Sequence, residues 1–368
     1  MIIKIGMKAM KKLVYSILAI TAAVLLSSAT PVNSQELTRD FSKSFTVNAS
    51  RTVDLSNRYG DINIETWDKN EVLIEVKVTV EMNSTERSER LLELIEIEFF
   101  ESDSAIGAKT ILDDRFSSAT RGVGSSRFRI DYMVKMPGQN GLTVANRYGN
   151  IKMNNHQGWV DIDLRYGNLF AGKLTRGNVK PVNTISVSYG KANIDEANWL
   201  STIVRYTNDF NITRVQAMTL DSRYSKIIVE SAGSIVADSK FDNINIDEIR
   251  NLVVDGAYTS IKLATLTNSL KLNVRYGSFE ATTVPAGFES ISIDAAYCGV
   301  GLGIDRSAKY RLDARVTYGS LSYCEECVDI QKRIIESNSR EVSGVAGSDK
   351  SPAATVNINS SYGSVRLR

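Results

Sequence analysis

Arginine recurs directly before an aromatic residue along much of this 368-residue sequence, and it is the side chain with the clearest chemical potential. Guanidinium groups form paired hydrogen bonds with carboxylates and phosphates, so a line of them on one surface predicts binding of an acidic polymer. Aspartate recurs two residues before several of these arginines, which favours a second interpretation, that the two columns neutralise each other. The arginine column is still the best candidate binding surface. Its candidate contact residues are Arg147, Arg165, Arg205, Arg223 and Arg275.

Residues suited to catalysis do not form a known motif. His156 is the only histidine, so any Ser-His-Asp or Cys-His arrangement would depend on it. The sequence contains no glycine-rich phosphate loop and no HExxH motif. The carboxylates recur from copy to copy, as structural positions do. We therefore predict no catalytic residue, no enzyme activity and no cofactor, while a polysaccharide-active β-helix enzyme (a lyase or hydrolase) stays open as an alternative.

The three cysteines are Cys298, Cys324 and Cys327. In an exported protein, Cys324 and Cys327 can close a small disulfide, which leaves Cys298 free. Three sulfurs without an evident fourth ligand do not predict a metal site.

Aromatic residues mark a repeat, and this repeat predicts the architecture that must position the arginines. From Tyr148 to Tyr318, successive aromatics are 17 to 23 residues apart. Apolar residues alternate before each aromatic and again after it, which indicates two short strands per copy. Such a unit cannot bury its own apolar side and must stack on its neighbours. The sequence therefore predicts an all-β, single-stranded, right-handed β-solenoid with turns of about 18 residues.

The aromatics share the inward parity of the residues two and four positions earlier, which predicts a stacked ladder inside one corner of the solenoid. The glycine that usually follows the aromatic is expected to take a positive φ. The predicted structural ladder comprises Tyr148, Tyr166, Tyr189, Tyr206, Tyr224, Tyr258, Tyr276, Tyr297, Tyr318 and Tyr362.

The domain boundaries follow from where the repeat is present. Residues 1–34 are predicted to be a signal peptide, because a basic start precedes an apolar run too short to span a bilayer. Residues 35–66 hold the first solenoid turn, and residues 67–140 are predicted to be a β-rich insert or cap with one short helix. The solenoid turns occupy 141–323, an irregular loop 324–353, and the last turn 354–368.

With 44 basic and 42 acidic residues, the near-balanced charge argues against a nucleic-acid partner. No second apolar stretch follows the leader, so no transmembrane helix is predicted in the mature chain.

The order of segments resembles the bacterial putative-adhesin domain family, an exported β-solenoid domain of unknown function. The resemblance is carried by the leader, the strand-and-helix N-terminal part, the segment VKMPGQNGLTV and the short turns of the type Y/F-G-x-I-x-I. It implies a non-enzymatic cell-envelope protein in the periplasm or on the outer surface, serving as an adhesin-like binding or scaffold module. The expected partner is an acidic glycan or an envelope protein. An envelope sensor or regulatory subunit is a further alternative.

Overall fold

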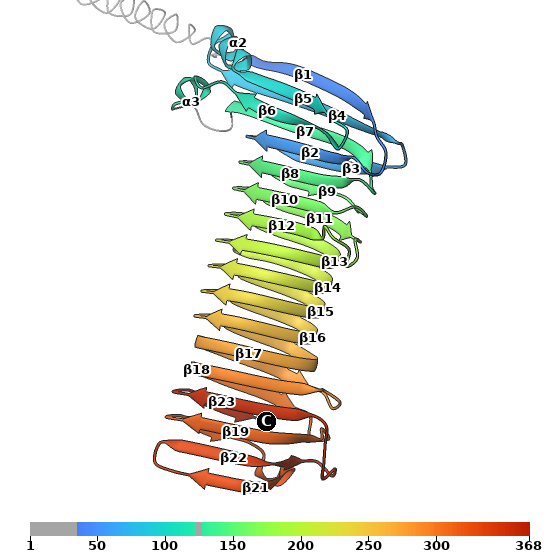
Figure 1. The fold of residues 1–368 in the computed structure, drawn as a ribbon. Helices are drawn as coiled ribbons and strands as arrows, with labels where there is room; N and C mark the ends of the chain where they lie inside the picture. Colours follow the sequence, from blue (N-terminus) through green and yellow to red (C-terminus); the bar gives the residue numbers. More distant parts are fainter. Residues whose placement is uncertain (1–34, 123–126) are drawn as a thin grey trace, which may run out of the picture.

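The computed structural model describes residues 35–122 and 127–368, so the signal peptide predicted over residues 1–34 lies outside the described residues. The described chain is all-β and forms one mixed sheet of 24 strands, accompanied by short helices (Figure 1). None of the helices in these ranges is long and apolar enough to cross a membrane.

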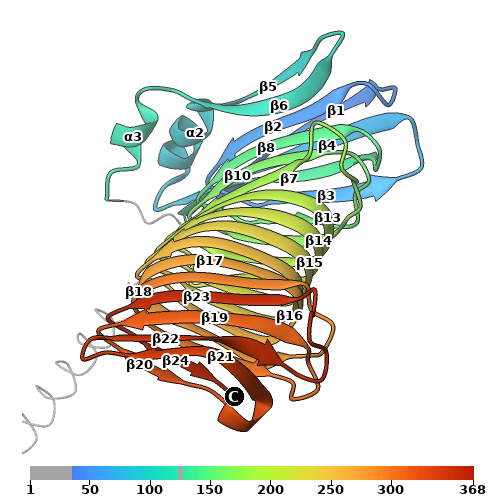
Figure 2. The same ribbon diagram turned by 60° about the horizontal axis from the view of Figure 1, so that its bottom comes forward.

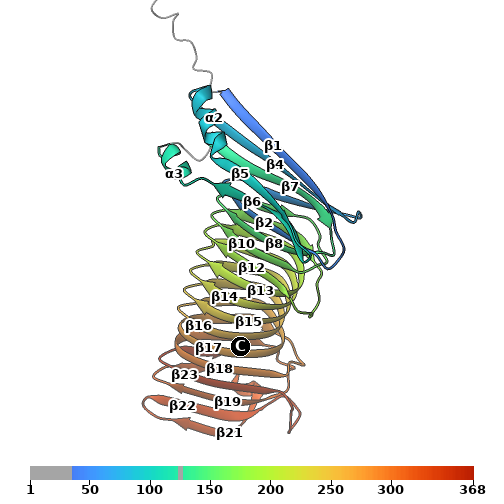
Figure 3. The same ribbon diagram turned by 45° about the horizontal axis from the view of Figure 1, so that its top comes forward.

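The N-terminal part combines antiparallel strands with two helices. It consists of β1 (Gln35–Thr46), β2 (Thr52–Arg58), β3 (Ile62–Trp67), β4 (Glu71–Met82), α2 (Thr85–Glu93), β5 (Ile95–Glu101), β6 (Ala105–Leu112), α3 (Phe116–Ala119) and β7 (Phe128–Pro137). Ser84 caps α2 by accepting a hydrogen bond from the Arg87 amide. β4 pairs antiparallel with both β1 and β7, whereas β2 and β3 pair in parallel with the first strands of the repeat region. This part therefore continues the stack at one end, with both helices on one side of it (Figure 3).

The central repeats pair in parallel, each with the next copy along the chain. Their strands are β8 (Gly141–Arg147), β9 (Ile151–Met153), β10 (Val160–Arg165), β11 (Asn168–Leu174), β12 (Asn183–Ser188), β13 (Lys191–Arg205), β14 (Asp209–Arg223), β15 (Lys226–Lys240), β16 (Asn243–Ala257), β17 (Ser260–Val284) and β18 (Ser290–Ile304). Arg205 lies opposite Arg223, and Arg223 lies opposite Lys240, so equivalent positions form columns. Alternate apolar residues of every strand enter one continuous core. The parallel stacking is visible in Figure 2, and its winding as a right-handed solenoid stays a prediction.

The C-terminal part departs from the sequence order. Its elements are β19 (Tyr310–Thr317), β20 (Ser320–Ser322), the 3-10 helix η2 (Glu325–Cys327), β21 (Val328–Ile335), β22 (Ser339–Ala346), β23 (Thr355–Ser361) and β24 (Ser364–Leu367). β23 pairs in parallel with β18 on one side and with β19 on the other, so it lies between them (Figure 1). The last repeat in sequence is thus not the last in space.

The expectation of an irregular loop over residues 324–353 needs correction, because β21 and β22 form an antiparallel hairpin there. β22 also pairs antiparallel with β19, so the hairpin covers the end of the stack. Most side chains of β21 are exposed, and an edge strand that buries little shows no alternation of apolar and polar residues.

Candidate functional site

The aromatic residues form a continuous stack along the repeats. Neighbouring ring centroids from Tyr59 to Tyr318 lie 4.7–5.2 Å apart, with interplanar angles of 1–9°. Tyr362 lies between Tyr297 and Tyr318, as the insertion of β23 requires. We call these twelve rings the tyrosine ladder: Tyr59, Tyr148, Tyr166, Tyr189, Tyr206, Tyr224, Phe241, Tyr258, Tyr276, Tyr297, Tyr362 and Tyr318.

The ladder lies on the surface, which corrects the inward orientation expected from the sequence. From Tyr148 onward its residues are 45–57% exposed, whereas Tyr59 is half-buried against Phe116 and Phe128. The cause is the backbone: every ladder residue has a positive φ, between 51° and 67°. This left-handed conformation interrupts the in-and-out alternation of an extended strand, so the parity of the preceding residues does not apply to the ring.

The positive φ belongs to the aromatic and not to the glycine after it, which is a second correction. A left-handed conformation costs an L-residue about 1–2 kcal/mol. Each inner ring stacks on two neighbours, and aromatic pairs contribute about 0.5–1.5 kcal/mol each beyond the buried area. Stacking therefore offsets the strain of the corner.

The glycines serve close approach between neighbouring turns. A Cβ on Gly167 would lie 1.9 Å from the carbonyl oxygen of Gly149, and a Cβ on Gly149 would lie 1.9 Å from that of Gly60. No side chain fits at that distance from a backbone atom.

The arginine column lies beside the ladder, one residue earlier in each turn. The parallel register brings the candidate residues Arg147, Arg165, Arg205, Arg223 and Arg275 into one file, with other residue types at the remaining turns. We call this file of side chains the arginine face.

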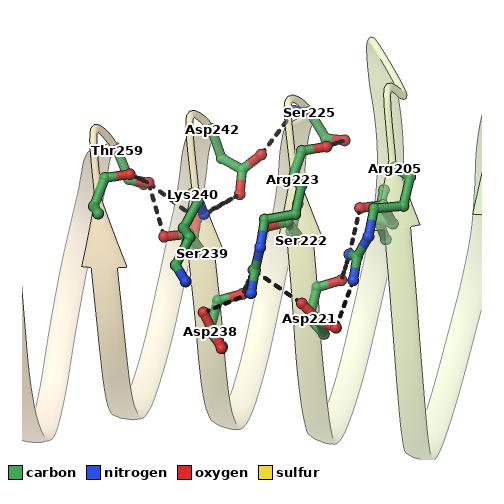
Figure 4. A network of polar contacts seen from close by, with 12 residues as sticks. Arg205, Asp221, Ser222, Arg223, Ser225, Asp238, Ser239, Lys240, Asp242 and Thr259 are labelled. Atoms are coloured by element: carbon green, nitrogen blue, oxygen red, sulfur yellow. Dashed lines mark hydrogen bonds and ion pairs between the residues drawn. The ribbon is translucent and has the colours of Figure 1, made fainter.

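Two arginines of this face are engaged by the next turn (Figure 4). Arg205 donates to a carboxylate oxygen of Asp221 at 2.5 Å and to the Asp221 carbonyl at 2.7 Å. Arg223 pairs with Asp221 at 2.9 Å and with Asp238 at 3.0 Å. Their side chains are only 26% and 21% exposed. In the middle of the column, aspartates therefore neutralise the arginines, as the second interpretation of the sequence expected.

The other candidate arginines of the face are more open to solvent. Arg165 is exposed and reaches Asp163 of its own strand at 3.4 Å. Arg147 and Arg275 are exposed and have no ion-pair partner among residues 35–122 and 127–368. Arg58 lies over the ring of Tyr59, with 5.2 Å between its guanidinium carbon and the ring centroid. The arginine face thus presents unpaired cations toward both ends and a neutralised segment between them.

A polar network lies inside the corner behind this neutralised segment (Figure 4). Asp242 is 2% exposed and accepts hydrogen bonds from the Ser225 amide at 2.7 Å and the Ser239 hydroxyl at 2.6 Å. Burial raises the pKa of the Asp242 carboxyl, although these hydrogen bonds oppose the shift. The sequence analysis did not single out Asp242, whose only signal is a carboxylate at a position usually occupied by glycine.

His156 lies in a different setting, below a surface cavity of about 480 Å³ where the N-terminal part meets the repeats. The ring is fully buried, and its Nε2 lies 2.9 Å from the Asn140 carbonyl oxygen. Burial lowers the pKa of His156 to about 4, so the ring is neutral near pH 7. Since no part of it reaches the surface, His156 serves the packing of this junction.

The cysteines are placed as separate features. Cys324 and Cys327 are joined by a disulfide, and Cys298 is buried with the pKa of its thiol raised by burial. Within the part of the chain that the structure describes, no three potential metal ligands come together.

Several solved bacterial structures are similar to this chain. A putative adhesin from Bacteroides fragilis is 14% identical, with a TM-score of 0.39, and the match covers 61% of this chain and 97% of that one. A putative cell adhesion protein from Clostridium sporogenes is 12% identical, with a TM-score of 0.20 and coverage of 90% and 99%. A putative lipid binding protein from Parabacteroides distasonis is 10% identical, with a TM-score of 0.29 and coverage of 91% and 98%.

No family model matches the chain, and no curated protein matches it. The resemblance to proteins described as adhesins is confirmed by the names of the similar structures.

Proposed function

We propose that the protein is a non-enzymatic, exported module of the cell envelope, an adhesin-like right-handed β-solenoid that binds a linear acidic polymer along the arginine face and the tyrosine ladder. An acidic glycan fits this surface best, and an acidic segment of an envelope protein is the alternative occupant. Its place is the periplasm or the outer surface, consistent with the leader predicted from the sequence.

One observation carries the proposal. Exposed arginines without ion-pair partners in the described chain lie directly beside the exposed ring edges of the tyrosine ladder. The ladder rings cover one another's faces at about 5 Å, so only their edges remain accessible. A sugar cannot stack on a covered face. The edge of an aromatic ring is its positive side, and tyrosine adds a hydroxyl that donates hydrogen bonds. Ring edges, hydroxyls and guanidinium groups together favour an anion.

The repeat spacing supports a linear partner. Equivalent positions recur once per turn along the stack, so a polymer lying along the column meets a ring edge at each turn and an arginine or lysine at many of them. Individual exposed ion pairs are weak, about 0–1 kcal/mol each, and repetition is the means by which such a surface gains affinity.

The test is binding of the mature chain to polygalacturonate at low and high salt, with neutral dextran as the comparison polymer. We expect binding to the acidic polymer that weakens as salt rises, because exposed charges are screened. The variant Arg147→Ser/Arg165→Ser/Arg275→Ser should lose most of this binding. The control variant Arg214→Ser/Arg250→Ser/Lys262→Ser removes the same charge from exposed positions four to nine residues after a ladder residue, away from the arginine face, and it should bind as the parent does. Equal loss in both variants would reject the arginine face as the site.

A further inference from the structure

Residues 354–368, the last repeat in the sequence, are inserted into the stack between two earlier repeats. β18 and β19 are consecutive strands in the chain, yet they are not paired with each other along their length. β23 separates them in parallel register with both, from Thr355 opposite Ser290 to Ser361 opposite Thr317. β24 extends the insertion by pairing with β18 and β20. Without this segment, the chain contains a slot one strand wide.

The slot recognises an extended strand mainly through backbone pairing and core packing. Val356, Ile358, Val365 and Leu367 of the segment are at most 5% exposed, and Tyr362 fills its place in the tyrosine ladder. Residues 354–368 are joined to the rest of the described chain by no ion pair, no disulfide and no hydrogen bond between two side chains. No covalent link or charge pair therefore distinguishes the chain's own segment from the same segment of another copy.

The connector between β22 and β23 crosses over β19. Ala346 lies opposite Tyr310 of β19 on one side, and on the other side the Arg311 amide donates to the Ala354 carbonyl at 2.9 Å. Since β22 and β23 flank β19 and neighbouring strands are about 4.8 Å apart, the connector must cover two strand spacings, about 10 Å. Residues 347–353 provide this reach and, apart from Pro352, are exposed.

We propose that the slot between β18 and β19 is an interaction site for residues 354–368 of a second copy of this chain, so that copies assemble by exchanging this strand. The exchanged assembly contains the same strand pairs and the same core contacts as the monomer. Its stability relative to the monomer is therefore decided by the connector and by concentration. A flexible connector of this length supplies an effective concentration in the millimolar range, which keeps dilute protein monomeric. Crowding of copies on a surface, or a shorter connector, favours exchange.

The direct test places one cysteine on each of two chains. Asp294 and Asn359 are exposed, lie opposite each other in the β18–β23 pair and are suited to a disulfide between adjacent strands. Full-length Asp294→Cys and Asn359→Cys variants are mixed at concentrations from micromolar to about millimolar, the range of the expected effective concentration, and then oxidised. We expect a covalent dimer whose yield rises at least several-fold over this range. The mixture of Asp294→Cys with Arg366→Cys is the matched control, because Arg366 lies opposite Gly301 and should not cross-link to residue 294.

A second variant forces the choice between monomer and exchanged assembly. Deletion of residues 347–353 makes the crossing over β19 impossible within one chain, and we expect the deletion variant to elute as a dimer or larger assembly with retained β-sheet signal. A monomer with native stability would overturn the proposal. If the deletion prevents folding, the cross-linking experiment decides. Absence of a covalent dimer there, or equal dimer in the mismatched control, overturns the proposal, provided that the double variant Asp294→Cys/Asn359→Cys cross-links within one chain.

Discussion

Two kinds of corner lie behind most of the ladder, with the buried thiol of Cys298 as an exception. In the glycine corners, at Gly60, Gly149, Gly167 and Gly190, the residue after the aromatic has no side chain, and neighbouring backbones approach closely. In the polar corners, at Thr207, Ser225, Asp242 and Thr259, the same position carries a buried polar side chain. The outer geometry is the same in both regions, since ring spacing and φ barely change. The binding face is therefore set by the left-handed aromatic and the strand register, and the corner interior can vary.

The two kinds of corner satisfy their backbone groups differently. In the glycine corners, Asn146 reaches inward and donates to the carbonyl oxygen of Gly60 at 3.0 Å. In the polar corners, the side chain of one turn accepts a hydrogen bond from a backbone amide of the turn before it. The Thr207 amide donates to the Ser225 hydroxyl, and the Ser225 amide donates to the Asp242 carboxylate. The second solution leaves a carboxylate buried, which gives this region its own pH dependence.

Filling a glycine corner should have the largest effect. In Gly167→Ala the new Cβ would meet a backbone carbonyl at 1.9 Å, so the neighbouring turns must separate. We expect a loss of about 3 kcal/mol in the free energy of unfolding, measured by chemical denaturation. Gly299→Ala is the control, because its Cβ has only the Ser364 hydroxyl within 4 Å, at 3.9 Å, and it should change stability by less than about 0.5 kcal/mol. Equal losses would show that the close approach is not the cause.

Acid should act on the region of the glycine corners through His156. The folded-state pKa of about 4 lies below the ordinary value of 6.5, so between these values the unfolded chain binds a proton that the folded chain does not. Stability should therefore fall as pH is lowered from 6.5 to 4, by up to about 3 kcal/mol. His156→Gln should remove this dependence in denaturation measured across the range. A slope unchanged in the variant would assign the acid sensitivity to other groups.

The left-handed ladder position predicts an unusual order of substitutions at Tyr206, where the two kinds of corner meet. Tyr206→Ala loses two ring contacts and keeps the strained φ, for a cost of about 2 kcal/mol. Tyr206→Gly loses the same contacts but tolerates the positive φ, so it should be more stable than the alanine variant by about 1 kcal/mol. Thermal and chemical unfolding of the two variants give the comparison. An alanine variant more stable than the glycine variant would contradict the backbone assignment.

Rising pH should act on the polar corners through Asp242. Burial holds the pKa of this carboxyl above its ordinary value of 3.8. Between the ordinary pKa and the raised pKa of the folded state, the folded chain binds a proton that the unfolded chain does not. Stability therefore falls as pH rises from 3.8 through the raised pKa. Relative to the parent, Asp242→Asn should gain stability as pH rises from 3 toward neutrality, measured as the difference between two denaturation series. The control is Asp238→Asn, which makes the same chemical change at an exposed position. An equal gain in both variants would assign the effect to the lost charge and not to the burial of Asp242.

The sequence predicted the repeat and the alignment of the arginines, because one aromatic per turn is visible without any structure. It did not predict the side on which the rings lie. Counting parity assumes an extended chain, and the left-handed residue at each corner breaks that assumption.

Two further features could not be deduced from residue types. The insertion of residues 354–368 between β18 and β19 depends on which backbone edges are open, and the alternation of Val356 and Ile358 suits any slot in the stack. Whether each arginine forms an ion pair also depends on local packing. Arg205 pairs with the aspartate of the next turn, whereas Arg275 lies near the equivalent Asp294 without an ion pair.

Binding of acidic oligosaccharides of increasing length tests the extended stripe most directly. With galacturonate oligomers of graded length, titrated at low salt by calorimetry, we expect affinity to rise with oligomer length, most of all for oligomers long enough to pass the neutralised segment and engage the free cations on both sides of it. Affinity that is already complete for the shortest oligomer, or no binding at any length, would contradict a binding surface that runs along the ladder.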